Sequence, residues 1–80
     1  MLTRFIHAAM SQAHYEILDG GSFYGEIPPC QGVFAHAPTR EACRVLLQEV
    51  LEEWIMLGLR LGHTLPEIDG IRLHVSGDAA

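Results

Sequence analysis

The chain has 80 residues, a formal net charge of −5 at pH 7 and an apolar fraction of 49%. This length is typical of a single domain, and the apolar content excludes a disordered chain. No apolar run reaches the roughly 18–20 residues of a membrane span, and the N-terminus lacks the basic start and cleavage site of a signal peptide. We therefore expect a cytoplasmic protein that does not bind membranes and whose thiols are reduced.

A domain of this size buries only about 60–65% of the surface that its unfolded chain exposes. Apolar burial then roughly cancels the entropic cost of ordering the chain, and two cysteines, Cys30 and Cys43, do not make a disulfide framework. We therefore expect self-association, as a homodimer or a higher assembly.

The charge distribution bears on the kind of partner. All the basic residues are arginines, and they are scattered. Without a basic stripe to neutralise phosphates, direct nucleic-acid binding is not expected. The acidic balance suits either a basic protein partner or simple solubility.

The chain begins with a helical pattern over residues 2–13. Apolar residues recur there at the spacing of one helix face, namely Leu2, Phe5, Ile6, Ala9 and Ala13. We expect this short amphipathic helix to pack on the domain or on a second subunit.

Three short strands are predicted next, over residues 14–18, 23–27 and 33–37. The turn signal Asp19-Gly20-Gly21-Ser22 separates the first two, and Pro28-Pro29 ends the second. Gly25 weakens its strand, so it marks a bulge or a close approach by another element. Strands linked this tightly predict an antiparallel meander.

The main helix is predicted to begin after Thr39, a favourable N-cap residue, and to stop at Gly62. Gly58 within it marks close packing or an early end. The predicted apolar seam is Cys43, Leu47, Val50, Trp54, Leu57 and Leu61, widened by Leu46, Leu51 and Ile55. After a connector, residues 71–75 alternate as a last strand, and residues 76–80 are predicted to be a flexible tail.

Residues 14–68 resemble the HicB-like antitoxin family. The resemblance rests on Gly21-x-Phe23-Tyr24-Gly25-Glu26-Ile27-Pro28, Gly32-Val33-Phe34-Ala35, Thr39-x-Glu41-Ala42, and a Leu-rich helix with Glu53-Trp54 and a Gly62…Pro66 exit. It implies a truncated ribonuclease H-like fold, a three-stranded sheet packed on a helix, without the metal-binding carboxylate cluster of the true nucleases. We therefore expect one α+β HicB-like domain over residues 1–75.

The resemblance also implies a function. HicB-like antitoxins cover the active surface of a small toxin that cleaves messenger RNA, and many carry a C-terminal DNA-binding segment that represses their own operon. Only about ten residues follow Gly70 here, too few for such a segment. We therefore expect a short, non-enzymatic member that occludes a small basic toxin. The alternative is an orphan oligomeric scaffold with a different protein partner.

Four residues are the predicted protein contacts. Tyr24 and Glu26 share a strand face, with Phe34 and His36 on the neighbouring strand, and an exposed aromatic strip of this kind is a candidate partner surface. The N-terminal helix could equally cover that face. Glu49 and Glu53 belong to an acidic patch on the main helix that could meet a basic toxin or simply face solvent.

The sequence gives little support for catalysis or metal binding. The five histidines lack a ligand spacing such as HxxxH, so no metal and no cofactor is expected. Cys30 and His36 could be imagined as a nucleophile and its base, but no third orienting group accompanies them. Cys43 and Trp54 are expected to be core residues, with an interface anchor as the alternative for the tryptophan.

Overall fold

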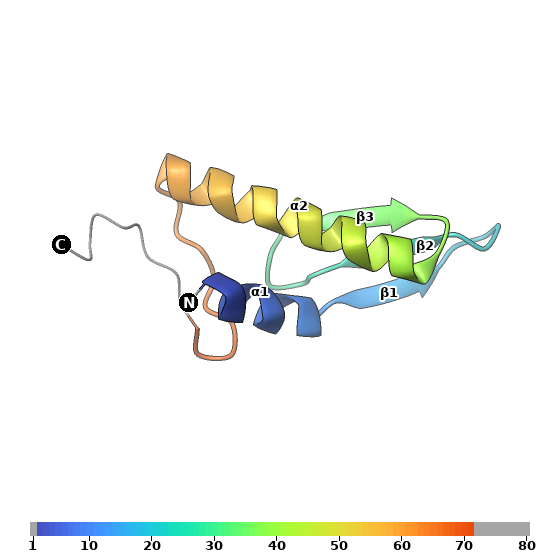
Figure 1. Cartoon of the computed structure of the whole chain (residues 1–80), viewed down its shortest axis with the longest axis horizontal. Coiled ribbons are helices and arrows are strands. Elements are labelled where there is room, and N and C mark those ends of the chain that lie inside the picture. Colours follow the sequence, from blue (N-terminus) through green and yellow to red (C-terminus); the bar gives the residue numbers. More distant parts are fainter. Residues whose placement is uncertain (1, 72–80) are drawn as a thin grey trace.

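The computed structural model describes residues 2–71. Its elements follow in the order α1 (Leu2–Ser11), β1 (His14–Ile17), β2 (Phe23–Glu26), β3 (Phe34–Ala37) and α2 (Arg40–Leu61). This confirms the α+β class and the predicted succession from the N-terminal helix through three strands to the main helix. Figure 1 shows α2 lying along the sheet, with α1 beside the C-terminal half of α2, beyond the end of the strands.

The three strands form one antiparallel sheet in the order β1-β2-β3. Ile17 pairs with Phe23 across the first hairpin, whose turn contains Gly20 and Gly21 at φ values of 93° and 89°. Glycine populates this left-handed region without a steric penalty. The predicted glycine turn and meander are therefore confirmed, and each strand is about one residue shorter than expected.

Side chains on the strands alternate between α2 and the opposite side. In β3, Ala35 and Ala37 are buried while Phe34 and His36 are exposed. Gly25 faces α2, where an added Cβ would lie 3.0 Å from the Tyr15 ring and 3.2 Å from Cys43 Sγ. The register continues without a bulge through this position, so Gly25 marks a close approach.

Both ends of α2 match the prediction. The Thr39 hydroxyl accepts a hydrogen bond from the backbone N–H of Ala42 at 3.1 Å, which satisfies one of the free donors of the first turn. At the other end Gly62 has a φ of 75°, and the His63 N–H donates to the Gly58 carbonyl at 2.8 Å. This pattern is a Schellman motif, which needs a left-handed residue just past the helix.

The predicted seam of α2 is partly wrong. The buried residues are Cys43, Leu47, Leu51, Ile55 and Gly58, whereas Leu57 and Leu61 are 55% and 57% exposed. Four-residue steps advance by about 40° around a helix, so the real seam drifts away from the predicted one. The arc of apolar side chains around this helix is wider than the surface that packs on it. The periodicity of the sequence does not show which half of that arc is buried.

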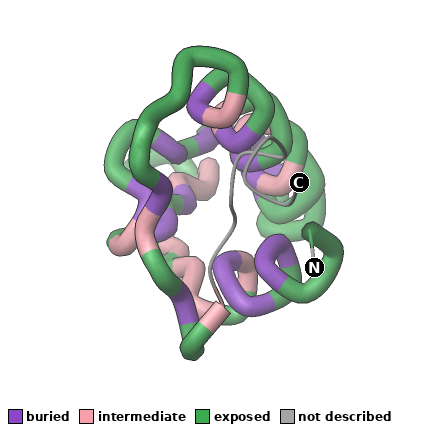
Figure 2. Tube along the Cα trace, turned by 90° about the vertical axis from the view of Figure 1, so that its left-hand side faces the viewer, coloured by how far each residue is buried: buried purple, intermediate pink, exposed green. Residues whose placement is uncertain are grey.

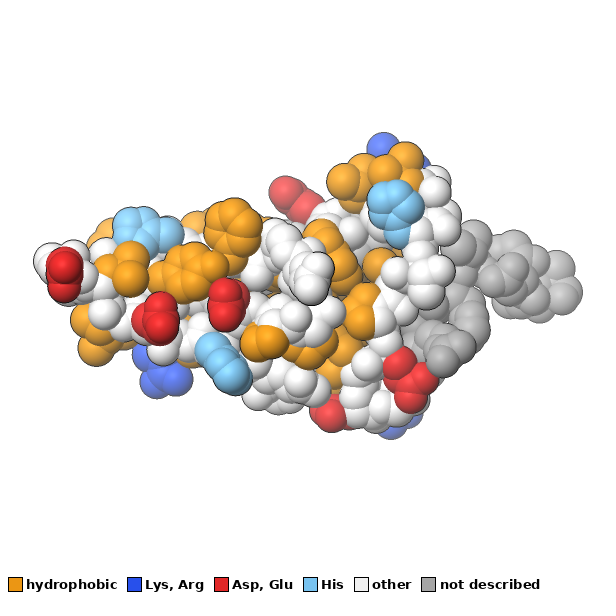
Figure 3. Space-filling model, turned by 180° about the vertical axis from the view of Figure 1, so that it is seen from behind, with side chains coloured by type: hydrophobic (Ala, Val, Ile, Leu, Met, Phe, Trp, Pro, Cys, Tyr) orange, Lys and Arg blue, Asp and Glu red, His pale blue; other side chains and the backbone are white. Residues whose placement is uncertain are grey.

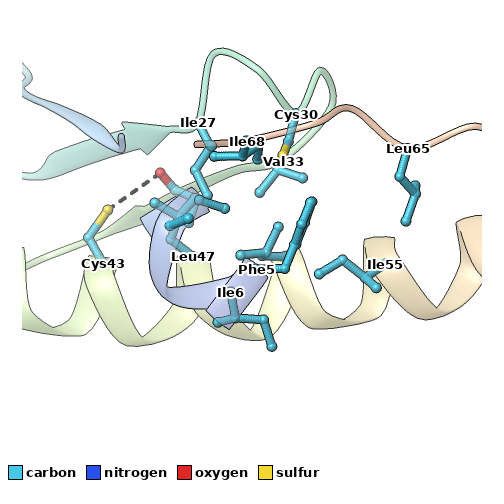
Figure 4. Close-up of a cluster of buried hydrophobic side chains, with 14 of the residues drawn as sticks. Phe5, Ile6, Ile27, Cys30, Val33, Cys43, Leu47, Ile55, Leu65 and Ile68 are labelled. Carbon is cyan, nitrogen blue, oxygen red and sulfur yellow. Dashed lines mark hydrogen bonds between the residues drawn. The ribbon is translucent and has the colours of Figure 1, made fainter. Parts of the chain in front are cut away.

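The core extends past the end of the sheet. Phe5 of α1 is fully buried, and the connector after α2 contributes Leu65 and Ile68; Figure 4 shows these side chains in one buried cluster with Ile55. Gly58 permits this packing, because an added Cβ would lie 2.8 Å from Leu65 Cδ2. In Figure 2 the buried stretches line the interior of the trace. Thus α1 and the connector cover the half of α2 that the sheet does not reach.

The end of the chain departs from the expected strand within the part that the structure describes. Ile71 forms a single β-bridge with Ile68 of its own connector. Residues 72–75 of the predicted strand, and the predicted tail over residues 76–80, lie outside the described residues.

Candidate protein-binding surface

The side of the sheet turned away from α2 is here called the outer face, and it carries Tyr24, Glu26, Phe34 and His36. Glu26 and His36 are exposed, and Phe34 is 56% exposed. Helix α1 packs beside α2 and does not lie over this face. Of the two arrangements that the sequence left open, the structure has the uncovered one.

An aromatic pair occupies the outer face. The rings of Tyr24 and Phe34 are stacked, with centroids 6.2 Å apart and planes inclined by 28°. The Tyr24 hydroxyl donates a hydrogen bond to Glu26 Oε1 at 3.2 Å. Desolvation raises the pKa of Tyr24, and the hydrogen bond to Glu26 raises it further, so the phenol stays a donor at neutral pH. Tyr24 and Glu26, predicted as protein contacts, therefore form one unit with Phe34.

Two shallow hollows flank this unit. One is lined by His14, Tyr15 and Glu16 together with Tyr24 and Glu26. The other is lined by Tyr24, Glu26, Phe34 and the loop over residues 27–33. Figure 3 shows the molecule from this side, with red acidic and pale blue histidine side chains among the orange hydrophobic ones. Tyr24 and Glu26 belong to both hollows and thus form the ridge between them.

Sequence reasoning missed part of this surface. Glu16 pairs with Tyr24 across β1 and β2, which brings a second carboxylate to the outer face. The hydroxyl oxygen of Ser22 lies 2.9 Å from Nε2 of His36, although the two residues are 14 positions apart in the sequence. The alternation within each strand shows which residues face outward, but these neighbours depend on the register between strands.

The other two predicted contacts lie elsewhere. Glu49 and Glu53 are both exposed on α2, the layer that covers the inner side of the sheet. At about 100° per residue, Glu49 is on the opposite side of the helix from the buried seam. The four predicted contacts therefore divide between opposite faces of the molecule.

The cysteines are not placed for nucleophilic chemistry. Cys30 is buried in the core, and burial raises the pKa of its thiol to about 11, while His36 is exposed on the outer face. Cys43 is fully buried, as predicted, and its thiol donates to the Ala35 carbonyl at 3.6 Å. Within residues 2–71 no group of three or more His, Cys, Asp or Glu side chains is arranged to hold a metal ion.

Trp54 occupies an intermediate position. Its side chain is half-buried and packs against the core, with the indole Nε1 near Gly32.

Among the described helices none is both long and apolar enough to cross a membrane.

The sequence profile of the UPF0150-like family matches residues 4–66. The match begins within α1 and ends in the connector after α2, so it includes every strand and the whole outer face. The chain belongs to the UPF0150-like family.

A solved structure carries the same fold. The crystal structure of TTHA0281 from Thermus thermophilus superposes with a TM-score of 0.85 at 36% sequence identity, covering 91% of each chain. Among curated proteins, none matches this member of the UPF0150-like family. The arrangement of α1, meander and α2 is therefore shared with a protein of the same length class, while neither comparison assigns a ligand to the outer face.

Proposed function

We propose that this chain is a non-enzymatic HicB-like antitoxin, or a binding module derived from one, that occludes a small basic RNA-cleaving toxin. Membership of the UPF0150-like family is consistent with the resemblance to HicB-like antitoxins. The observation that carries the proposal is the stacked pair Tyr24–Phe34 beside Glu26 on an uncovered sheet face.

The chemistry of the outer face suits such a partner. Tyrosine and phenylalanine supply large contact areas at a low entropic cost, and aromatic residues are enriched in interface hot spots. Glu26 on the ridge and Glu16 beside it add negative charge, which speeds and orients the association of a basic protein. The hollows on both sides of the Tyr24–Glu26 ridge would receive side chains of the toxin.

The experiment begins with a search beside the gene for a second gene that encodes a small basic protein. Where one is present, the two proteins are co-expressed, followed by pull-down and a growth assay. We expect the two proteins to co-purify and the chain to restore growth. Glu26→Lys should abolish both effects, because it places a positive charge against a basic partner. Glu52→Lys makes the same charge change on the exposed side of α2 and should leave rescue intact.

Two results would refute this proposal. Absence of both a complex and rescue for the wild-type chain would remove the toxin-binding function. Equal loss of rescue by Glu26→Lys and Glu52→Lys would remove the outer face as its site.

The second candidate is an oligomeric scaffold with a different protein partner. It is favoured by exposed apolar side chains on α2, including Leu57 and Leu61, which the toxin proposal does not use. A genomic neighbourhood without a gene for a small basic protein would favour the scaffold over the antitoxin.

A further inference from the structure

Two carboxylates of the outer face line the same hollow between β1 and β2, here called the β1–β2 hollow. Its lining consists of His14, Tyr15, Glu16, Tyr24 and Glu26. Glu16 lies opposite Tyr24 across the two strands, and Glu26 is two residues farther along β2. Diagonal neighbours in a sheet lie about 7–8 Å apart, within reach of long side chains. The carboxylates of Glu16 and Glu26 can therefore hold one group between them.

Both carboxylates act on the same hydroxyl and keep capacity for another donor. Desolvation raises the pKa of the Tyr24 phenol, the hydrogen bond to Glu26 and the charge of Glu26 raise it further, and the charge of Glu16 adds to them. The Tyr24 hydroxyl uses only one of the several acceptor positions of Glu26. Within residues 2–71 neither Glu16 nor Glu26 takes part in an ion pair.

The cations of the described chain lie away from this hollow. The arginines that the structure describes belong to α1 and α2, and neither helix lies over the outer face; they are Arg4, Arg40, Arg44 and Arg60. The chain as a whole has a formal net charge of −5. A positive group that complements the two carboxylates therefore comes from another molecule.

The ring of Tyr24 offers a flat surface beside the carboxylates. Phe34 stacks on this ring from β3 and lines only the other hollow, so the side of the ring turned toward β1 remains open. The chain makes a comparable contact within itself, where the guanidinium carbon of Arg40 lies 5.1 Å from the centre of the Tyr15 ring. A cation within about 6 Å of an aromatic ring is attracted to the face of that ring.

We propose that the β1–β2 hollow binds the guanidinium group of an arginine side chain of the partner protein. A guanidinium is planar and carries five N–H donors, so it can bond to both carboxylates while its plane stacks on the Tyr24 ring. A lysine ammonium satisfies the charge but has no plane to stack. This inference rests on the proposed function, because the arginine belongs to the basic partner proposed above.

The test is an NMR titration of the full, ¹⁵N-labelled chain at constant ionic strength and about pH 7.5, where histidine side chains are in general neutral. The probes are the N-acetyl methylamides of arginine, lysine and citrulline, of which citrulline is the uncharged analogue of arginine. We expect capped arginine to shift the amide signals of residues 14–16 and 24–26 with a Kd on the order of 10 mM. Capped lysine should bind at least about threefold more weakly, and capped citrulline should cause no saturable shift.

Two pairs of variants separate charge from stacking. Glu16→Gln should weaken the binding of capped arginine by at least about threefold, whereas Glu53→Gln removes the same charge from an exposed position on α2 and should leave it unchanged. Tyr24→Leu should abolish the preference for arginine over lysine, while Tyr24→Phe keeps the ring and should retain that preference.

Three results would overturn the arginine site. Equal binding of the three probes would remove its selectivity, and equal effects of Glu16→Gln and Glu53→Gln would place the binding elsewhere. A preference for arginine that survives in Tyr24→Leu would remove the aromatic ring from the site.

These outcomes are distinct from those of the co-expression assay. A toxin that binds the wild-type chain, together with capped arginine that does not, would leave the proposed function standing and refute the arginine site. Selective binding of capped arginine without a toxin complex would do the reverse: it would support the hollow as an arginine site and refute the toxin as its source.

Discussion

At the scale of single residues, the sharpest constraint is the space around Gly25. It lies where β2 approaches α2, with the Tyr15 ring and Cys43 Sγ on its inner side. The neighbouring residues, Tyr24 and Glu26, point outward and form the ridge between the two hollows. The position of that ridge therefore depends on a residue that contributes no side chain to it.

Gly25→Ala should lower the free energy of unfolding by about 1–3 kcal/mol, the usual cost of overpacking a core. The reduced entropy of the unfolded chain offsets only about 0.5–1 kcal/mol of this. Urea unfolding followed by circular dichroism, at a fixed protein concentration, measures the change. Glu26→Ala alters the exposed neighbour and should shift stability by no more than about 0.5 kcal/mol; equal effects of the two variants would contradict the steric explanation.

Because the thiol of Cys30 is buried, we expect its ionisation to lower the stability of the protein at alkaline pH. Burial raises the pKa of this thiol from 9.0 to about 11, so above pH 9 the unfolded chain loses a proton that the folded chain keeps. Ionisation of Cys30 therefore leaves the free energy of unfolding unchanged below pH 9 and lowers it as the pH rises toward 11. Unfolding midpoints measured under reducing conditions should therefore fall over this range.

Cys30→Ala should show a shallower fall in the same pH range, whatever its stability at neutral pH. Cys43 and Tyr15, whose pKa values burial also raises, remain in both proteins and serve as an internal control. Parallel curves for the two proteins would show that Cys30 ionisation does not contribute.

At the scale of elements, α2 owes its limits to local chemistry. Thr39 caps its first turn, and Gly62 ends it in a left-handed conformation. Both signals act within a few residues of the chain, which is why the sequence predicted them. In contrast, the positions of α1 and the connector decide which half of the helix surface is buried.

Thr39→Ala should destabilise the protein by about 1 kcal/mol, because the N–H of Ala42 loses its acceptor. The measurement is the urea midpoint at fixed protein concentration. Thr64→Ala makes the same change at an exposed position after the helix and should have an effect below about 0.5 kcal/mol. A comparable loss from Thr64→Ala would refute the capping account.

At the scale of the whole molecule, two different parts of the chain pack on α2 and together enclose a single core. The sheet packs on the N-terminal half of α2, and α1 with the connector packs on the remainder. The outer face, which we propose as a binding surface, is one of the surfaces that this arrangement leaves exposed.

Phe5→Ala tests whether α1 belongs to that single core. Phe5 is fully buried, so its truncation should cost about 3–5 kcal/mol. Circular dichroism and Trp54 fluorescence should report one shared, lowered midpoint. Leu2→Ala, on the exposed side of α1, should change little. A Trp54 transition that keeps its midpoint in Phe5→Ala would mean that α1 unfolds as a separate unit.

The sequence by itself determined the α+β class, the order of the elements and the ends of α2. Strand alternation, the glycine turn, the Thr39 cap and the Gly62 stop are all encoded within a few residues. It also placed Tyr24 and Glu26 on one strand face, because that needs only a period of two.

Tertiary structure alone decided which surfaces are free. It left the outer face uncovered, joined Tyr24 to Phe34 across strands, and placed Glu49 and Glu53 on the opposite side of the molecule. It also excluded Leu57 and Leu61 from the core. These outcomes depend on contacts between segments that are far apart in the chain. A local pattern of apolar residues does not determine which of those contacts form.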